Sequence, residues 1–192
     1  LDGTRCQIPT SDRRDALRNV ADYHYRATLK LGPSNVAARI DLAENLLYFG
    51  RYSDAEDELE IALRLAPKEI LVWNNLGYAA YSMGRLEKAV EYYEEALRLD
   101  PRHARIRTAL ADAFRRLDRE EDAIRELERA RGDAGDDREL QATIAFKLAA
   151  IHEYDKKFAD AVKEYQRHID LGGPDAAKAK SRIRHIYESE AQ

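Results

Sequence analysis

Residues 73–101, WNNLGYAAYSMGRLEKAVEYYEEALRLDP, decide the fold of this 192-residue chain. The stretch predicts two amphipathic helices, because it is rich in good helix formers and its apolar residues recur at helical spacing. Small residues nevertheless stand inside both helices, notably Gly77, Ala89 and Ala96. They predict places where one helix backbone approaches its neighbour closely, so that a larger side chain would overpack the contact. Trp73 is expected to be a core aromatic between these contacts.

The second half of this stretch recurs along the chain. RLEKAVEYYEEALRLDP (85–101) aligns with RYSDAEDELEIALRLAP (51–67), 34 residues before it, and with REEDAIRELERARGDAG (119–135), 34 residues after it. A further copy, KFADAVKEYQRHIDLGGP (157–174), follows at 38 residues, and we expect its four extra residues in the loop around RGDAGDDREL. A half copy, RNVADYHYRATLKLGP (18–33), precedes the others. Such self-similarity indicates an array of repeats.

The array resembles the tetratricopeptide repeat (TPR) family, in particular its regular bacterial arrays. The matching residues in the repeat that begins at Ile70 are Trp73, Leu76, Gly77, Ala89, Tyr93, Ala96 and Pro101. The family pattern places Trp, Leu and Gly on a first helix, and Ala, an aromatic residue, Ala and Pro on a second. The chain departs from the pattern at His168, which replaces a small residue, and at Gly135, which stands where proline is expected.

The resemblance implies an all-α fold: a right-handed superhelical solenoid of antiparallel helix pairs, with about ten helices. We expect an irregular segment at 1–11, a half repeat at 12–35, full repeats at 36–69, 70–103, 104–141 and 142–175, and a C-terminal capping helix at 176–188. Ser11 is the expected cap of the first helix. Gly50 and Gly84 are expected in tight turns, where left-handed backbone angles are needed.

Composition narrows the classes of function. The 32 Lys and Arg are interspersed with 36 Asp and Glu, and the absence of a basic block argues against a nucleic-acid partner. No apolar run in the sequence reaches the roughly 18 residues of a membrane span. The chain begins with Leu1, so a missing native N-terminus with upstream targeting signals is one interpretation. The lone Cys6 leaves cytoplasm and periplasm equally open.

The sequence shows no motif for catalysis. The histidines have no metal-ligand spacing, and surface or groove positions are expected for His24, His103, His152, His168 and His185. There is no Gly-rich phosphate loop, nucleophile elbow or kinase signature. We therefore predict a protein that is not an enzyme, with no catalytic residues, no metal site and no cofactor.

The resemblance also implies that the first helices of the pairs line a concave groove that binds a peptide or protein segment. Transfer of the family's contact positions predicts a groove of Tyr48, Asn74, Tyr78, Tyr81, Arg105, Asp112, Arg115, Phe146 and Tyr154, followed by Lys180, Arg184 and Tyr187 of the last helix. Tyr and Arg are enriched at binding hot spots. The alternative is that the tyrosines pack between helices and the arginines are solvated. Ile40 and Glu44 do not match the clamp of chaperone-binding members, which argues against chaperone tails as ligands.

Two functions remain open at this point. The preferred one is an adaptor or scaffold that captures a partner protein in the groove. The other is a structural spacer or self-assembling unit, suggested by the missing first helix of the half repeat, which leaves one end of the array open. A variant of the second is a regulatory domain cut from a larger enzyme or from an envelope or secretion protein.

Overall fold

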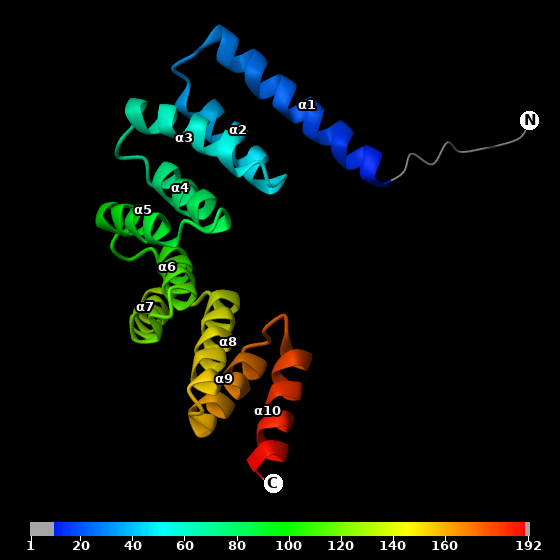
Figure 1. Ribbon diagram of the computed structural model, residues 1–192, viewed down its shortest axis with the longest axis vertical. Coiled ribbons are helices and arrows are strands. Elements are labelled where there is room, and N and C mark those ends of the chain that lie inside the picture. The colour runs from blue at the N-terminus through cyan, green and yellow to red at the C-terminus, as the bar shows by residue number, and fades with distance from the viewer. Residues whose placement is uncertain (1–9, 191–192) are drawn as a thin grey trace, which may run out of the picture. The chain divides into compact units, whose positions relative to one another are not determined.

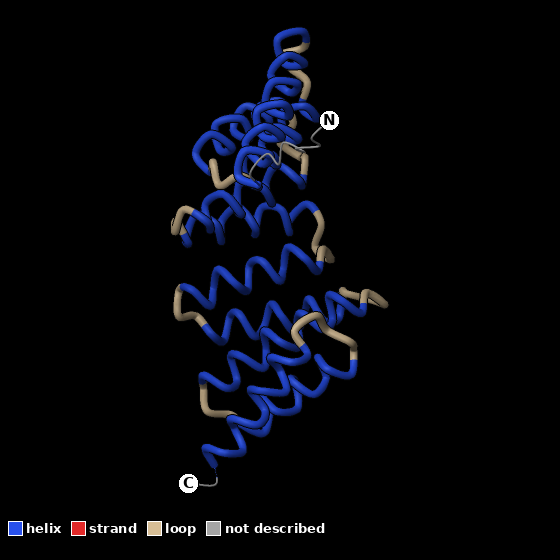
Figure 2. The backbone as a smooth tube through the Cα atoms, turned by 90° about the vertical axis from the view of Figure 1, so that its right-hand side faces the viewer, coloured by secondary structure: helices blue, strands red, loops and turns tan. Residues whose placement is uncertain are grey.

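The structure, a computed structural model, describes the backbone of residues 10–190 and the side chains of residue 20 and residues 22–189. Within that range the chain forms ten α-helices and no strand (Figures 1 and 2). The bounds are α1 Thr10–Leu31, α2 Val36–Tyr48, α3 Tyr52–Leu65, α4 Ile70–Ser82, α5 Leu86–Leu99, α6 Ala104–Arg116, α7 Glu120–Asp133, α8 Arg138–Tyr154, α9 Phe158–Asp170 and α10 Ala176–Glu190. The predicted all-α class and the ten helices are confirmed.

The N-terminal end differs from the expectation. The helix α1 already includes Ser11, which therefore does not cap it from outside. Most of the predicted irregular segment, 1–9 with Cys6, lies outside the described residues.

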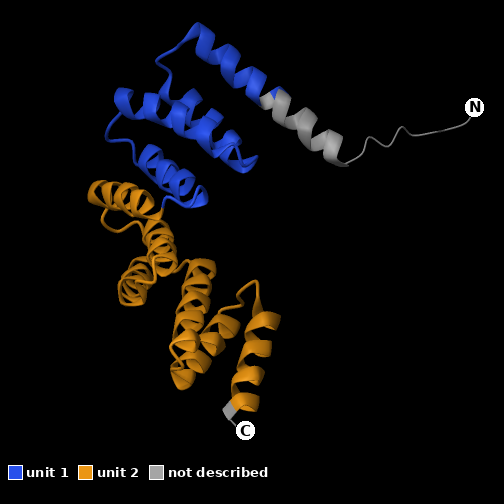
Figure 3. Cartoon of the chain, viewed as in Figure 1, with its two compact units in different colours: residues 1–85 blue, residues 86–192 orange. Residues whose placement is uncertain are grey.

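The helices form two compact units, residues 1–85 and 86–192 (Figure 3). In the first unit α1 packs on α2, α2 packs on α3 and α4, and α3 packs on α4. In the second unit each helix from α5 to α10 packs on the next one in the chain. Contacts between sequence neighbours are the packing pattern of a helical repeat array.

The repeated small residues form the centre of each unit. On α3 the side chains of Ala55, Leu59 and Ala62 are fully buried. The equivalent residues of α7 are Ala123, Leu127 and Ala130, with at most 1% of their surface exposed. Methyl-sized side chains at these positions let a neighbouring helix approach closely, while the leucine between them fills the space, which explains why the repeat keeps them.

A recurrent hydrogen bond closes each loop that enters a first helix. The donors stand 34 residues apart, and each binds the carbonyl oxygen of the residue six positions earlier: Arg39 to Pro33, Trp73 to Pro67, Arg107 to Pro101 and Gln141 to Gly135. The Trp73 Nε1 atom lies 2.9 Å from its acceptor, and its side chain is half-buried rather than a core aromatic. Arg and Gln can replace Trp here because the feature that is kept is the N–H donor.

The helix α8 holds the four extra residues of the last repeat. It spans 17 residues, whereas α6 spans 13. The loop before α8, 134–137, is as long as the loop before α6, 100–103. The expected insertion in the loop is therefore wrong, and the extra residues add one turn to the helix, since a turn holds about 3.6 residues.

The turns between paired helices all use a left-handed residue. Gly50 and Gly84 have φ of 75° and 77°, as expected. In the next two pairs the position is taken by Asp118 and Lys156, with φ of 55° and 59°. A side chain in this conformation costs roughly 1–2 kcal/mol, and Asp tolerates it better than Lys. The later turns are thus strained where the earlier ones are not.

Candidate functional site

In the first unit, two predicted groove residues present an aromatic ring to solvent. Tyr48, at the end of α2, is 76% exposed, and Tyr78, on α4, is 46% exposed. The Tyr78 ring packs edge-on against Tyr52 at a centroid distance of 6.4 Å. Tyr81 is only half exposed, and Ile40 is buried, so neither forms an open contact surface of the same kind.

Polar side chains connect α2 and α4 in the same unit. Asn74 donates to the Asn75 side-chain oxygen at 3.3 Å, and Asn75 donates to Glu44 at 3.1 Å. Asn75 is buried, whereas Glu44 is exposed. The predicted ligand-binding residue Asn74 therefore already has a hydrogen-bond partner within the protein.

In the second unit, Arg105 and Asp112 line one hollow of about 240 Å³. Each of them is paired within the protein: Arg105 with Asp137 at 2.7 Å, and Asp112 with Lys147 at 2.7 Å. Asp137 also caps α8, accepting from the Leu140 N–H, and this hydrogen bond together with Arg105 lowers the pKa of its carboxyl group. A partner carboxylate would have to compete with Asp137 for Arg105, which weakens the expectation of a basic centre there.

Arg115 and Tyr154 come together at a second hollow, of about 210 Å³, between α6 and α8. Tyr154 is 75% exposed. Among the described residues its ring stacks on no other aromatic ring. Arg115 is exposed and takes part in no ion pair among the described residues. These two side chains are therefore available to a partner.

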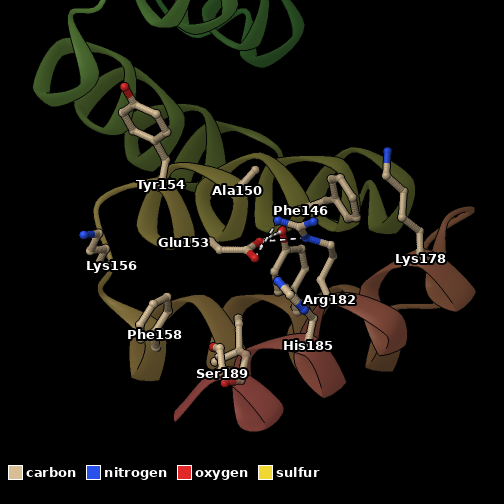
Figure 4. A pocket seen from close by; sticks show the side chains of 12 residues that line it. Phe146, Ala150, Glu153, Tyr154, Lys156, Phe158, Lys178, Arg182, His185 and Ser189 are labelled. Carbon is tan, nitrogen blue, oxygen red and sulfur yellow. Dashed lines mark hydrogen bonds and ion pairs between the residues drawn. The ribbon is translucent and has the colours of Figure 1, made fainter. Parts of the chain in front are cut away.

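Tyr154 also borders a larger hollow of about 600 Å³, between α8, α9 and α10, which we call the C-terminal pocket (Figure 4). Its lining includes the aromatic residues Phe146, Tyr154 and Phe158 and the basic residues Lys156, Lys178 and Arg182. The Phe146 ring is held edge-on against Tyr165 at 5.4 Å and against His168 at 5.1 Å. The predicted residues Phe146 and Tyr154 are thus brought to one pocket.

The last helix contributes other residues than those expected. Lys178, Arg182 and His185 line the pocket, whereas Lys180, Arg184 and Tyr187 do not. The helix α10 begins 18 residues after α9 (158 to 176), just as α8 begins 18 residues after α7 (120 to 138), so its register is that of the other repeats and the pocket uses a different face of the helix from the one expected. The family contact positions carry no signal for this face of α10.

Glu153 lies at the centre of the C-terminal pocket in a closed network (Figure 4). It accepts a hydrogen bond from the Tyr165 hydroxyl at 2.8 Å and two from Arg182, at 2.6 and 3.0 Å. Burial, and then the bond to Glu153, raise the pKa of Tyr165 to about 12. The bond to Glu153 also raises the pKa of Arg182. Both groups hold their protons at neutral pH, so the network fixes side chains rather than transferring protons.

His168 is a core residue, and the expectation of a surface or groove position is wrong for it. It is 1% exposed, and its Nδ1 lies 2.8 Å from the Ala142 carbonyl oxygen. Its ring occupies the space beside Gly173, where a Cβ would come within 2.0 Å of the ring. The bulky His168 thus explains why Gly173 has no side chain.

Two searches of the described residues bear on the kind of site. They contain no group of three or more His, Cys, Asp or Glu side chains placed to hold a metal ion. No helix in the range 10–190 has the length and apolar character to cross a membrane.

Comparisons with known proteins agree on the repeat type. Tetratricopeptide repeat profiles match residues 12–70 and 70–103. No curated protein matches the chain.

Solved structures resemble the chain along most of its length. MamA is 19% identical, with a TM-score of 0.73 over 90% of this chain and 97% of MamA. A thermophilic TPR protein of Thermus thermophilus is 19% identical, with a TM-score of 0.70 over 92% and 91%. YrrB, described as a TPR protein with an unusual peptide-binding site, is 18% identical, with a TM-score of 0.70 over 88% and 84%. At these identities the likeness establishes the fold and not the ligand.

Proposed function

The chain belongs to the tetratricopeptide repeat family, and we propose that it is a non-enzymatic interaction module that binds a segment of a partner protein on its first helices. The family consists typically of protein-interaction modules. The finer proposal concerns which surface of this chain meets the partner and which side chains contribute most. YrrB is described as having a peptide-binding site, and a peptide segment is the ligand that we propose here.

The observation that carries the proposal is the exposure of tyrosines on the first helices. Tyr48 on α2, Tyr78 on α4 and Tyr154 on α8 are 76%, 46% and 75% exposed. Of the tyrosines on the second helices α3, α5 and α9, Tyr93 and Tyr165 are each 2% exposed, whereas Tyr52 and Tyr92 are partly buried. An exposed tyrosine offers a large contact area at low cost in side-chain entropy, and its hydroxyl group can find a polar partner. This asymmetry favours the first helices as the contact surface.

Quantitative affinity capture from native lysate tests the proposal. Tyr78→Ala and Tyr154→Ala remove exposed rings, and each is expected to reduce the amount of retained partner about tenfold or more if the ring is a hot spot. Lys163→Ala, on the exposed side of α9, is the matched control. Circular dichroism would verify that all three variants stay folded. Retention of the same proteins by wild type and both tyrosine variants would contradict the proposal.

These variants are better tests than a change at Arg105. Because Arg105 pairs with Asp137, the residue that caps α8, a charge reversal at Arg105 would disturb the start of that helix. A loss of binding could then reflect a local structural change instead of a lost contact.

Association through the N-terminal end is a second proposal, supported by the exposure of α1. In the described part of the chain no first helix precedes α1 to form a pair with it, and α1 packs mainly on α2. Thr28 is exposed, although the equivalent Ala62 and Ala130 of later repeats are fully buried. Analytical ultracentrifugation over a dilution series tests it. A mass above 22.0 kDa that falls on dilution is expected, whereas a constant monomer mass would contradict it.

A further inference from the structure

We infer that the C-terminal pocket binds an acidic segment of a partner protein that places an aromatic or aliphatic side chain between its carboxylates. The inference rests on the proposed function, because it names the partner chemistry for one part of the interaction surface.

An apolar floor is the first feature of the pocket that selects a ligand. Phe146 and Phe158 contribute aromatic rings and Ala150 a methyl group to its lining, on either side of the Glu153–Arg182 pair (Figure 4). The volume of about 600 Å³ has room for more than one side chain. Since Phe146 already packs against Tyr165 and His168, its ring loses little freedom when a ligand binds. The floor therefore favours an apolar anchor residue in the partner.

Basic side chains at the rim are the second feature. The Lys178 ammonium group lies 5.3 Å from the centre of the Phe146 ring. In the part of the chain that the structure describes, neither Lys178 nor Lys156 is within ion-pair distance of a carboxylate. The acidic lining residue Glu153 is already occupied by Arg182 and Tyr165. The pocket thus keeps a net positive charge, which favours carboxylates on the ligand.

A second hollow in the same unit lacks this free charge. It lies between α5, α6 and α7, has about 580 Å³, and is also lined by arginines. Arg119 and Arg125 both pair with Asp122, and Arg129 pairs with Glu126. Its positive charges are therefore satisfied within the protein, whereas the two lysines of the C-terminal pocket are not.

A protein segment fits these features better than a nucleic acid or a lipid surface. A polyanion binds through many phosphate contacts, whereas the pocket offers only two unpaired lysines. The chain as a whole also has a net charge of −4, which disfavours a polyanion. The apolar floor between the lysines matches a single anchor side chain flanked by acids.

Fluorescence anisotropy with a labelled peptide, Glu-Glu-Asp-Trp-Leu-Asp-Glu-Glu, tests the inference on the full chain. Wild type is expected to bind, with affinity that falls as salt is raised. Lys178→Glu is expected to weaken binding about fivefold, and the double variant with Lys156→Glu about 25-fold, if the two charges act independently. Lys163→Glu, an equal charge change on the exposed side of α9, should leave the affinity unchanged.

Several results would overturn the inference. One is equal binding of a peptide that has Ser-Ser in place of Trp-Leu, since the apolar floor would then have no role. Another is equal weakening by Lys163→Glu and Lys178→Glu, which would reflect total charge. Tighter binding of an oligouridine or of phosphatidylserine vesicles would assign the pocket to a different class of partner.

Peptide binding and partner capture together distinguish the acidic ligand of the pocket from the wider interaction surface. If the peptide does not bind but partner capture still requires Tyr154, the acidic ligand is wrong and the interaction module stands. If the peptide binds through Lys178 while capture is insensitive to Tyr78 and Tyr154, the pocket stands and the wider interaction surface falls.

Discussion

The pair α6–α7 and the pair α8–α9 belong to the same unit but follow the repeat to different degrees. In the first pair the first helix has 13 residues, and Ala123 and Ala130 are fully buried on the second. In the second pair the first helix has 17 residues, and His168 stands where Ala130 stands in the other. The regular pair borders the hollow between α5, α6 and α7, whose arginines are paired, while the irregular pair borders the C-terminal pocket with its two unpaired lysines.

This difference separates two kinds of departure from a repeat pattern. His168 is matched by Gly173 within the core, so the two replacements compensate each other. The additional turn of α8 has no such compensation, and this longer helix contributes Phe146 and Tyr154 to the hollow that Lys178 of α10 also lines. The exchange at His168 and Gly173 therefore affects the stability of the core. The added turn of α8, which borders a pocket, indicates a binding role instead.

The largest effect is expected when the compensation in the irregular pair is broken. Gly173→Ala would place a Cβ 2.0 Å from the His168 ring, and this overpacking should destabilise the second unit by about 3 kcal/mol. Urea unfolding followed by circular dichroism measures the change. Adding His168→Ala, which restores the small residue of the other repeats, should recover part of the loss.

The matched control is Gly132→Ala at the end of α7. A Cβ there meets no atom within 4 Å, so the same substitution should be neutral or stabilising by up to about 1 kcal/mol. Equal destabilisation by both changes would show that the His168 ring does not exclude a side chain at Gly173.

A smaller effect, of opposite sign, is expected at the turns. Lys156→Gly in the irregular pair should stabilise by about 1 kcal/mol, because it relieves a left-handed backbone at φ 59°. Asp118→Gly in the regular pair should gain less, since Asp adopts this conformation more readily. Thermal unfolding of both variants gives the comparison. Gly84→Ala, where a Cβ meets no atom within 4 Å, should destabilise, and a gain there would refute the backbone explanation.

The smallest effect is expected from the Tyr165 hydroxyl. Tyr165→Phe removes its hydrogen bond to Glu153 and should cost about 1 kcal/mol below pH 10, while Glu153 keeps its bonds to Arg182. Folding raises the Tyr165 pKa to about 12 from its unfolded value of about 10. The unfolded state therefore loses its proton first, and the contribution of the hydroxyl group to stability declines as pH rises from 10 through 12.

Urea unfolding of wild type and Tyr165→Phe near pH 8 and near pH 11 checks this pH dependence. The difference in unfolding free energy between the two proteins should shrink at the higher pH. A difference that stays constant or grows would mean that Tyr165 is not held in its protonated form by the fold.

Much of the fold was predictable because the repeat constrains burial directly. A 34-residue period with small residues at fixed places suffices to predict the helix pairs, as Ala55, Ala62, Ala123 and Ala130 show. The period cannot tell whether added residues lengthen a helix or a loop, because both options preserve the pattern on either side. The extra turn of α8 was missed for this reason.

The site was less predictable, since it depends on side chains that meet across repeats. Arg105 and Asp137 are 32 residues apart, and Asp112 and Lys147 are 35 apart. Charges at such separations pair only once the helices are packed, so the sequence could not reveal that Arg105 and Asp112 are already paired. Tyr48, Tyr78 and Tyr154 are exposed on the first helices, and their place in a binding groove stays a prediction.

The most direct measurement of the central proposal is site-specific photo-crosslinking in native cells, with benzoylphenylalanine in place of Tyr154 or of Lys163. Both positions are exposed and lie in the same helix pair, but Tyr154 ends the first helix α8 and Lys163 lies on the second helix α9. A first-helix contact surface predicts one dominant protein adduct from position 154 and none from position 163. The same adduct from both positions, or an adduct from position 163 alone, would contradict it.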